Sequence, residues 1–101
     1  MAMKANHTAT GSVVLLHAAG LHARPCVKLT KLAKRFRAHV RVGAADGGPW
    51  TDAKSIARVM AMKTPGNATL FFEAEGEDAQ EAVAALIRLV QSDFEEPTHA
   101  A

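Results

Sequence analysis

One histidine stands between an apolar, strand-like segment and an amphipathic helix, in the run Gly20-Leu21-His22-Ala23-Arg24-Pro25. We expect the helix to begin just after His22, because a proline is tolerated in a first turn, where its missing N–H removes no bond. First-turn N–H groups lack acceptors within a helix, and the helix dipole is positive at that end. An anion carried on His22 would therefore meet ready-made donors, and phosphate is the anion that this arrangement favours.

The pair His22 and Arg24 suits transfer of a phosphoryl group. A neutral imidazole nitrogen is a competent nucleophile near neutral pH, and the group it accepts can be passed on again. Arg24 supplies a planar fork of donors for phosphate oxygens, which a lysine could not reproduce. Alone, a histidine before a helix is more often a surface residue or polar cap, and a lone arginine a solvated charge. Their spacing at a helix start favours the phosphate role.

Strand-like and helix-like patterns alternate around this pair. Strands are predicted at residues 12–17, 39–42, 50–52 and 68–74. Because Pro49 cannot donate to a sheet ladder, the third of these strands should be very short or lie at an edge. Helices are predicted after His22, over residues 55–62, and from Ala79 to Phe94 with Asp78 as N-cap. The order βαββαβα predicts one α+β domain, with helices on one face of an antiparallel sheet.

Composition limits the classes of protein that this chain can belong to. With 101 residues, 49% of them apolar, it can form one compact domain, which we place at residues 12–95 between flexible segments 1–11 and 96–101. A net charge of +2 does not by itself indicate nucleic-acid binding. No apolar run has the length of a secretory signal or membrane span, so we expect a soluble, cytoplasmic protein. The histidines and the single cysteine have no metal-ligand spacing, and we predict no metal and no cofactor.

The sequence resembles the HPr family, the histidine-containing phosphocarriers of the bacterial phosphoenolpyruvate:sugar phosphotransferase system. Three features carry the resemblance: residues 20–25, the run Lys54-Ser55-Ile56 opening a second short helix, and Glu75-Gly76-Glu77-Asp78 before the last helix. The similarity covers residues 12–95 in the same element order. It implies an open-faced β-sandwich, in which three helices cover one face of a four-stranded antiparallel sheet.

The resemblance also implies roles for individual residues. His22 matches the histidine that accepts a phosphoryl group on Nδ1 from enzyme I and passes it to an enzyme IIA, and Arg24 matches the active-site arginine. The protein would then be a monomeric carrier in sugar uptake rather than a turnover enzyme. Ser55 matches a serine that a regulatory kinase phosphorylates, and a phosphorylase restores, in some bacteria, although a helix N-cap would also explain a serine there. Partner-binding positions of the family match Lys31, Lys34, Lys54, Ile56 and Arg58.

Two positions depart from the family pattern. Cys26 stands where alanine is common, close enough to His22 that we expect its oxidation to interfere with the site. The chain is longer than many relatives between His22 and Ser55, and we place the additional residues in the turn-rich segment 43–50.

Three alternative functions remain open at this point. The same carrier chemistry could serve a regulatory, nitrogen-related phosphotransferase branch. A small α+β nucleic-acid-binding domain would explain the basic first helix, but Phe71-Phe72 supplies only one outward ring where such sheets need several. A structural adaptor could bind partners without accepting phosphate.

Overall fold

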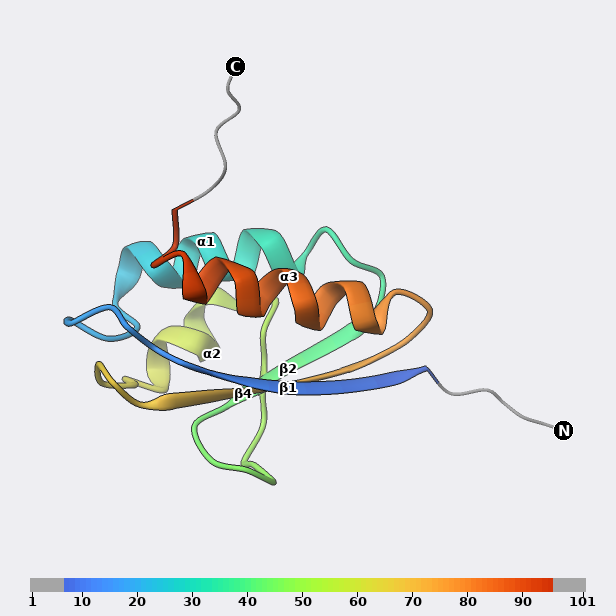
Figure 1. The fold of residues 1–101 in the computed structure, drawn as a ribbon, viewed down its shortest axis with the longest axis horizontal. Coiled ribbons are helices and arrows are strands. Elements are labelled where there is room, and N and C mark those ends of the chain that lie inside the picture. The colour runs from blue at the N-terminus through green and yellow to red at the C-terminus, as the bar shows by residue number, and fades with distance from the viewer. Residues whose placement is uncertain (1–6, 96–101) are drawn as a thin grey trace, which may run out of the picture.

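Four antiparallel strands form one sheet in the order β1-β4-β2-β3, and three helices complete the fold (Figure 1). The computed structural model describes residues 7–95; residues 1–6 and 96–101, which belong to the segments expected to be flexible, lie outside the described residues. The elements are β1 (Thr8–Val14), α1 (Ala23–Ala33), β2 (His39–Gly43), β3 (Thr51–Asp52), α2 (Ile56–Ala61), β4 (Thr69–Glu75) and α3 (Ala79–Gln91).

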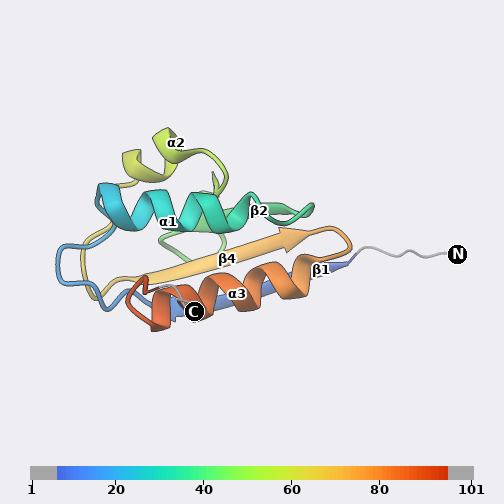
Figure 2. The same ribbon diagram turned by 90° about the horizontal axis from the view of Figure 1, so that it is seen from above.

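All three helices lie on one face of the sheet, which confirms the predicted fold class (Figures 1 and 2). Helix α3 packs over β1 and β4, α1 runs beside α3, and α2 lies on the outer side of α1. In β4, apolar residues alternate with partly exposed ones, so that Leu70, Phe72 and Ala74 point into the core. The apolar stripe of α3, which includes Leu86 and Val90, covers them from above.

Strand β1 begins at Thr8, four residues before the predicted start at Ser12, and it ends at Val14 rather than at His17. The expectation that residues 8–11 belong to a flexible segment is therefore wrong. These residues pair with β4 as far as Glu75. The hydrophobic pattern missed them because Gly11 faces α3 without a side chain, where an added Cβ would lie 2.6 Å from Cδ1 of Ile87.

Strand β3 has two residues and lies at the edge of the sheet, as the position of Pro49 predicted. The preceding loop folds back onto the open face, where a Cβ on Gly43 would lie 2.9 Å from the carbonyl oxygen of Pro49 and 3.3 Å from the ring of Trp50. This close approach explains a glycine at the end of β2.

Asp78 occupies the predicted N-cap position of α3, but its side chain does not cap that helix. Its two carboxylate oxygens accept hydrogen bonds from the main-chain N–H groups of Arg37 and Ala38, each at 2.8 Å. The bond from Arg37 is the largest of the interactions that lower the pKa of Asp78 below its ordinary value. The carboxylate therefore ties the start of α3 to the segment between α1 and β2.

Candidate functional site

His22 is the N-cap of α1, with an extended backbone (φ −92°) and an exposed side chain that does not cap the helix. The first helical bond runs from the Cys26 N–H to the His22 carbonyl at 3.1 Å. The N–H groups of Ala23 and Arg24 have no acceptor within the helix, and Pro25 has none to donate. Two donors at the positive end of the helix dipole thus lie directly beside the imidazole, as the sequence predicted.

A tight turn before α1 fixes where His22 enters the helix. Gly20 has φ +76°, and the next residue, Leu21, is buried and donates its N–H to the Thr64 carbonyl at 2.9 Å. A Cβ on Gly20 would overlap that carbonyl oxygen, and a Cβ on Gly66 would lie 2.6 Å from the Ala18 carbonyl oxygen. The turn and the loop after α2 are therefore packed backbone against backbone, which only glycine permits.

A second histidine, His17, contacts the ring of His22. The two Nε2 atoms are 2.9 Å apart, and the ring centroids are 4.9 Å apart. Nδ1 of His17 lies 2.9 Å from Oδ1 of Asp93, which follows the end of α3. Sequence reasoning missed both His17 and Asp93 as site residues. The only signal was a second histidine five residues before His22, whereas Asp93 is 76 residues from His17 and gave none.

The segment after α3 holds Asp93 in place. Asp93 and Phe94 both have positive φ, 56° and 63°. Phe94 is only 3% exposed and meets the His17 ring edge to face at 6.3 Å between centroids. Lys28 of α1 donates an ammonium hydrogen bond to the Phe94 carbonyl at 2.7 Å. Phe94 was predicted within the last helix, but the helix ends at Gln91 and the chain turns back to bury this ring. That turn places Asp93 beside His17.

The predicted partner-binding residues divide into two groups. Lys31, Lys34 and Arg58 are exposed, as is Arg24 in the first turn of α1. Lys54 differs, because it is only half exposed and its ammonium donates to the Phe36 carbonyl at 2.7 Å, which joins the segment after α1 to the segment before α2. Apolar side chains are also partly exposed on these two helices, at 39–40% each: Val27, Ile56 and Met60.

Ser55 is the N-cap of α2, and its Oγ accepts the main-chain N–H of Arg58 at 3.4 Å. This capping role accounts for the serine, and its modification by a kinase stays a prediction. Cys26 is fully buried, with Sγ 3.5 Å from the Leu21 carbonyl oxygen, and burial raises the pKa of its thiol. Because the thiolate is the reactive form, this environment disfavours oxidation of Cys26, and the effect that its oxidation would have on His22 stays a prediction.

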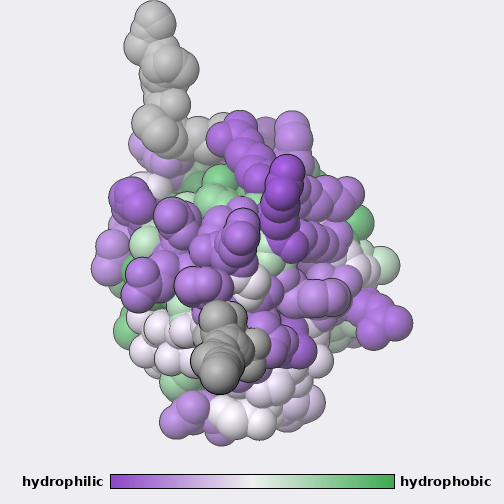
Figure 3. All heavy atoms as spheres, turned by 90° about the vertical axis from the view of Figure 1, so that its right-hand side faces the viewer, coloured by the Kyte–Doolittle hydropathy of each residue, from purple (hydrophilic) through white to green (hydrophobic). Residues whose placement is uncertain are grey.

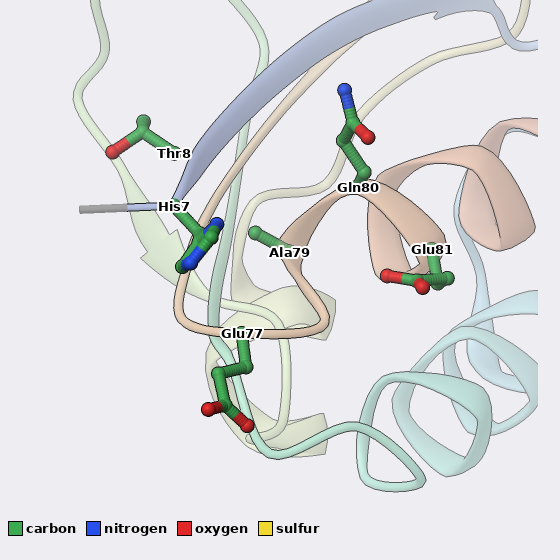
Figure 4. A pocket seen from close by; sticks show the side chains of 6 residues that line it. All are labelled: His7, Thr8, Glu77, Ala79, Gln80 and Glu81. Carbon is green, nitrogen blue, oxygen red and sulfur yellow. The ribbon is translucent and has the colours of Figure 1, made fainter. Parts of the chain in front are cut away.

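A polar pocket lies at the other end of the molecule, between the start of β1 and the first turn of α3 (Figure 4). Helix α3 begins at this pocket and ends next to Asp93, so about 20 Å of helix separates the pocket from His22. The surface at this end is mainly hydrophilic (Figure 3), whereas ligand pockets are mostly apolar. The lining residues are His7, Thr8, Glu77, Ala79, Gln80 and Glu81.

The open face of the sheet does not suit single-stranded nucleic acid. Phe72 is fully buried and Phe71 is half-buried. Arg41 on the same face is paired with Glu73 at 3.3 Å and Glu75 at 3.6 Å. Nucleic-acid-binding sheets present several exposed rings and unpaired basic groups. Within residues 7–95, no group of three or more potential ligand side chains could hold a metal ion, and no helix is long and apolar enough to cross a membrane.

The site therefore consists of an exposed histidine at the start of α1 in an open-faced sandwich. The family model for the "PTS HPr component phosphorylation site" matches residues 9–92. The chain belongs to the HPr family of phosphocarriers of the phosphotransferase system. A crystal structure of HPr from Thermoanaerobacter tengcongensis superposes with a TM-score of 0.78 at 29% identity, covering 89% of this chain and 99% of that one.

Curated relatives include two kinds of phosphocarrier. The chain is 39% identical over 82 residues to phosphocarrier protein HPr of Cupriavidus necator, covering 81% of this chain and 90% of that protein. It is 33% identical over 89 residues to phosphocarrier protein NPr of Escherichia coli, covering 88% and 98%. It is also 44% identical over 81 residues to a multiphosphoryl transfer protein of Vibrio cholerae, where the match covers 79% of this chain and 20% of the longer protein.

Proposed function

We propose that His22 carries the phosphoryl group on Nδ1, accepting it from phospho-enzyme I and passing it to an enzyme IIA in sugar uptake. The observation that carries this proposal is the exposed His22 ring at the N-cap of α1, beside two main-chain donors without helical acceptors. Nδ1 is the ring nitrogen nearer the main chain, and Nε2 already contacts His17. Nδ1 is therefore the nitrogen available next to the helix start.

Transfer needs alignment and neutralisation of charge more than covalent help. The lone pair of His22 Nδ1 attacks the phosphorus in line with the bond to the donor nitrogen, which breaks and returns its electron pair to the donor. The equatorial oxygens meet the N–H groups of Ala23 and Arg24 and the dipole of α1. The exposed guanidinium of Arg24 can add two parallel hydrogen bonds. The same steps in reverse pass the group on, so the chain acts as a carrier and not as a turnover enzyme.

The helical face beside His22 provides the docking surface for the proposed partners. Partly exposed apolar side chains on α1 and α2 would supply its apolar contacts: Val27, Ile56 and Met60. Lys31, Lys34 and Arg58 are exposed basic residues of the same two helices and their ends, and would steer acidic surfaces of enzyme I and enzyme IIA. We expect complexes that are brief and weaken as salt increases. Lys54 is expected to contribute less, because its ammonium is already bound to Phe36.

A regulatory branch is the second candidate for the pathway, because the chain is similar to NPr as well as to HPr. The two candidates share the chemistry at His22 and differ in the partners. Transfer from His22 to a sugar-specific enzyme IIA and to a nitrogen-type enzyme IIA, measured side by side, separates them. Faster transfer to the nitrogen-type acceptor would replace the sugar-uptake assignment.

Incubation with phosphoenolpyruvate and enzyme I from the same organism tests the site. Intact-protein mass spectrometry should show one added, acid-labile phosphoryl group. The variant His22→Ala should show none, whereas His39→Ala, which removes an exposed histidine on the open face of the sheet, should be phosphorylated normally. Phosphorylation of His22→Ala, or of no form of the protein, would refute the proposal.

A further inference from the structure

The rings of His17 and His22 and the carboxylate of Asp93 form a continuous chain of hydrogen bonds. Asp93 Oδ1 lies 2.9 Å from Nδ1 of His17, and Nε2 of His17 lies 2.9 Å from Nε2 of His22. The three residues come from the turn before α1, the N-cap of α1 and the segment after α3. Of the four nitrogens of the two rings, only Nδ1 of His22 takes no part in this chain.

The positions of the protons follow from the chemistry of the groups. An ionised carboxylate only accepts hydrogen bonds, so Nδ1 of His17 must carry the proton toward Asp93. In a neutral His17 ring Nε2 is then an acceptor, because which nitrogen is protonated is set by the bond the other makes. His22 must donate from its own Nε2. Its Nδ1 consequently has a free lone pair.

We propose that His17 and Asp93 are positioning residues, which hold His22 in the Nε2-protonated form and so direct phosphoryl transfer to Nδ1. This inference rests on the proposed function of His22. The carboxylate acts through His17, and neither residue needs to touch the phosphoryl group.

The same chain balances charge during transfer. As Nδ1 forms its bond to phosphorus, the His22 ring keeps its Nε2 proton and becomes cationic. That proton points at Nε2 of His17, whose opposite nitrogen donates to the negative Asp93. The developing positive charge is thus compensated through a ring that the protein has already oriented, as a carboxylate does for histidine in serine hydrolases.

The local structure indicates that this contact is built into the fold. Asp93 and Phe94 both have a positive φ, a backbone conformation that is unfavourable for residues other than glycine. Their conformation is held by the buried Phe94 ring and by the Lys28 hydrogen bond to the Phe94 carbonyl. On the other side, Gly20 donates its N–H to the His17 carbonyl at 2.9 Å, which fixes the turn that bears His17.

The proton positions are measured directly by ¹⁵N NMR of the histidine rings in the unphosphorylated protein. Signals are assigned by comparison with His17→Ala and His22→Ala. We expect His17 to be protonated on Nδ1 and His22 on Nε2 in the wild type. In Asp93→Leu, which has no side-chain acceptor, the His17 signals should move away from the Nδ1-protonated pattern. A wild-type His17 protonated only on Nε2 would overturn the proposal.

Single-turnover phosphorylation by phospho-enzyme I measures how much His17 and Asp93 contribute to the rate of transfer to His22. Asp93→Asn keeps the size of the side chain and removes its charge, and we expect the rate to fall about 10–100-fold. The phosphorylation rate of His17→Ala should fall by a similar factor. The matched controls, Asp46→Asn in the loop after β2 and His39→Ala, should keep the wild-type rate. Thermal unfolding of each variant separates loss of rate from loss of folding.

The two proposals fail in different ways. If the wild type accepts no phosphoryl group, the function proposed for His22 is refuted, and the positioning role falls with it. If the wild type is phosphorylated on His22 and Asp93→Asn reacts equally fast, only the positioning role is refuted.

Discussion

The substitution Gly20→Ala should destabilise the protein far more than the same change at Gly47. Both glycines have positive φ, +76° and +90°. At Gly47 an added Cβ meets nothing within 4 Å. At Gly20 it would overlap the Thr64 carbonyl oxygen and lie 2.9 Å from Cα of Pro65. These neighbours are backbone atoms, which cannot rotate away as a flexible side chain would.

Three contributions to the free energy of unfolding decide the effect of each substitution. An L-residue in the left-handed region costs about 1–2 kcal/mol, and this cost applies at both positions. Alanine also reduces the freedom of the unfolded chain, and that benefit is again common to both. At Gly20 the loop must move away from Thr64, so the buried Leu21 N–H loses its 2.9 Å bond at a further cost of about 1–3 kcal/mol. The difference in stability between Gly20→Ala and Gly47→Ala therefore measures the cost of disturbing the packing of the turn against Thr64.

Urea and thermal unfolding measure that difference. For a domain of this size, 1 kcal/mol corresponds to about 4–8 °C, so Gly20→Ala should melt on the order of 10 °C below Gly47→Ala. The slope of free energy against urea concentration should be unchanged if unfolding stays two-state. Equal stability of the two variants would refute the reasoning that the turn before His22 is held backbone to backbone against the loop after α2.

Three further changes test other parts of the structure. Arg24→Lys should slow single-turnover phosphorylation about tenfold, because lysine cannot bind two phosphate oxygens in parallel, while Arg35→Lys in the turn after that helix should not; equal rates would contradict the role of Arg24. The pKa of Asp78 is lower in the folded state than in the unfolded chain, so its contribution to stability is complete above the unfolded value and is lost as pH falls through the folded value. Asp78→Asn should therefore lose less stability than the wild type between about pH 6 and about pH 2 in urea titrations, and an identical loss would show that the bonds to the α1–β2 segment do not act on folding. The buried Cys26 should react with a disulfide reagent much more slowly in the native protein than in urea, and equal rates would mean that the core opens readily at this position.

Most of the fold was predictable because it depends on local periodicity. Alternation in β4 and the helical stripe of α3 each specify an element and the face that it buries. Pro49 correctly indicated a short edge strand. Element ends were predicted less well, and the start of β1 was missed because Thr8 to Gly11 carry little apolar character. Their pairing depends on β4 and on the side chain of Ile87, which are distant in the sequence.

The candidate site was predictable only where it is local. The run from Gly20 to Pro25 contains the tight turn, the histidine, the helix start and the arginine, so their order and the start of the helix follow from short-range rules, whereas the contact of this turn with Thr64 does not. Asp78 shows the limit of such rules, because its N-cap position was predicted whereas its carboxylate binds the main chain of another segment. A side chain chooses its partner from everything that the fold brings near.

The sequence by itself determined a βαββαβα domain with His22 and Arg24 at the positive end of a helix. Hydrophobic spacing and helix-terminus chemistry act over a few residues, and they suffice for that much. Only the tertiary structure decided that His17 contacts the His22 ring and Asp93 contacts His17, that Lys54 is bound to Phe36, and that Cys26 is shielded. The contact of Asp93 with His17 joins residues 76 apart along the chain, and it forms because burial of Phe94 and the turn at Gly20 fix where the two segments meet.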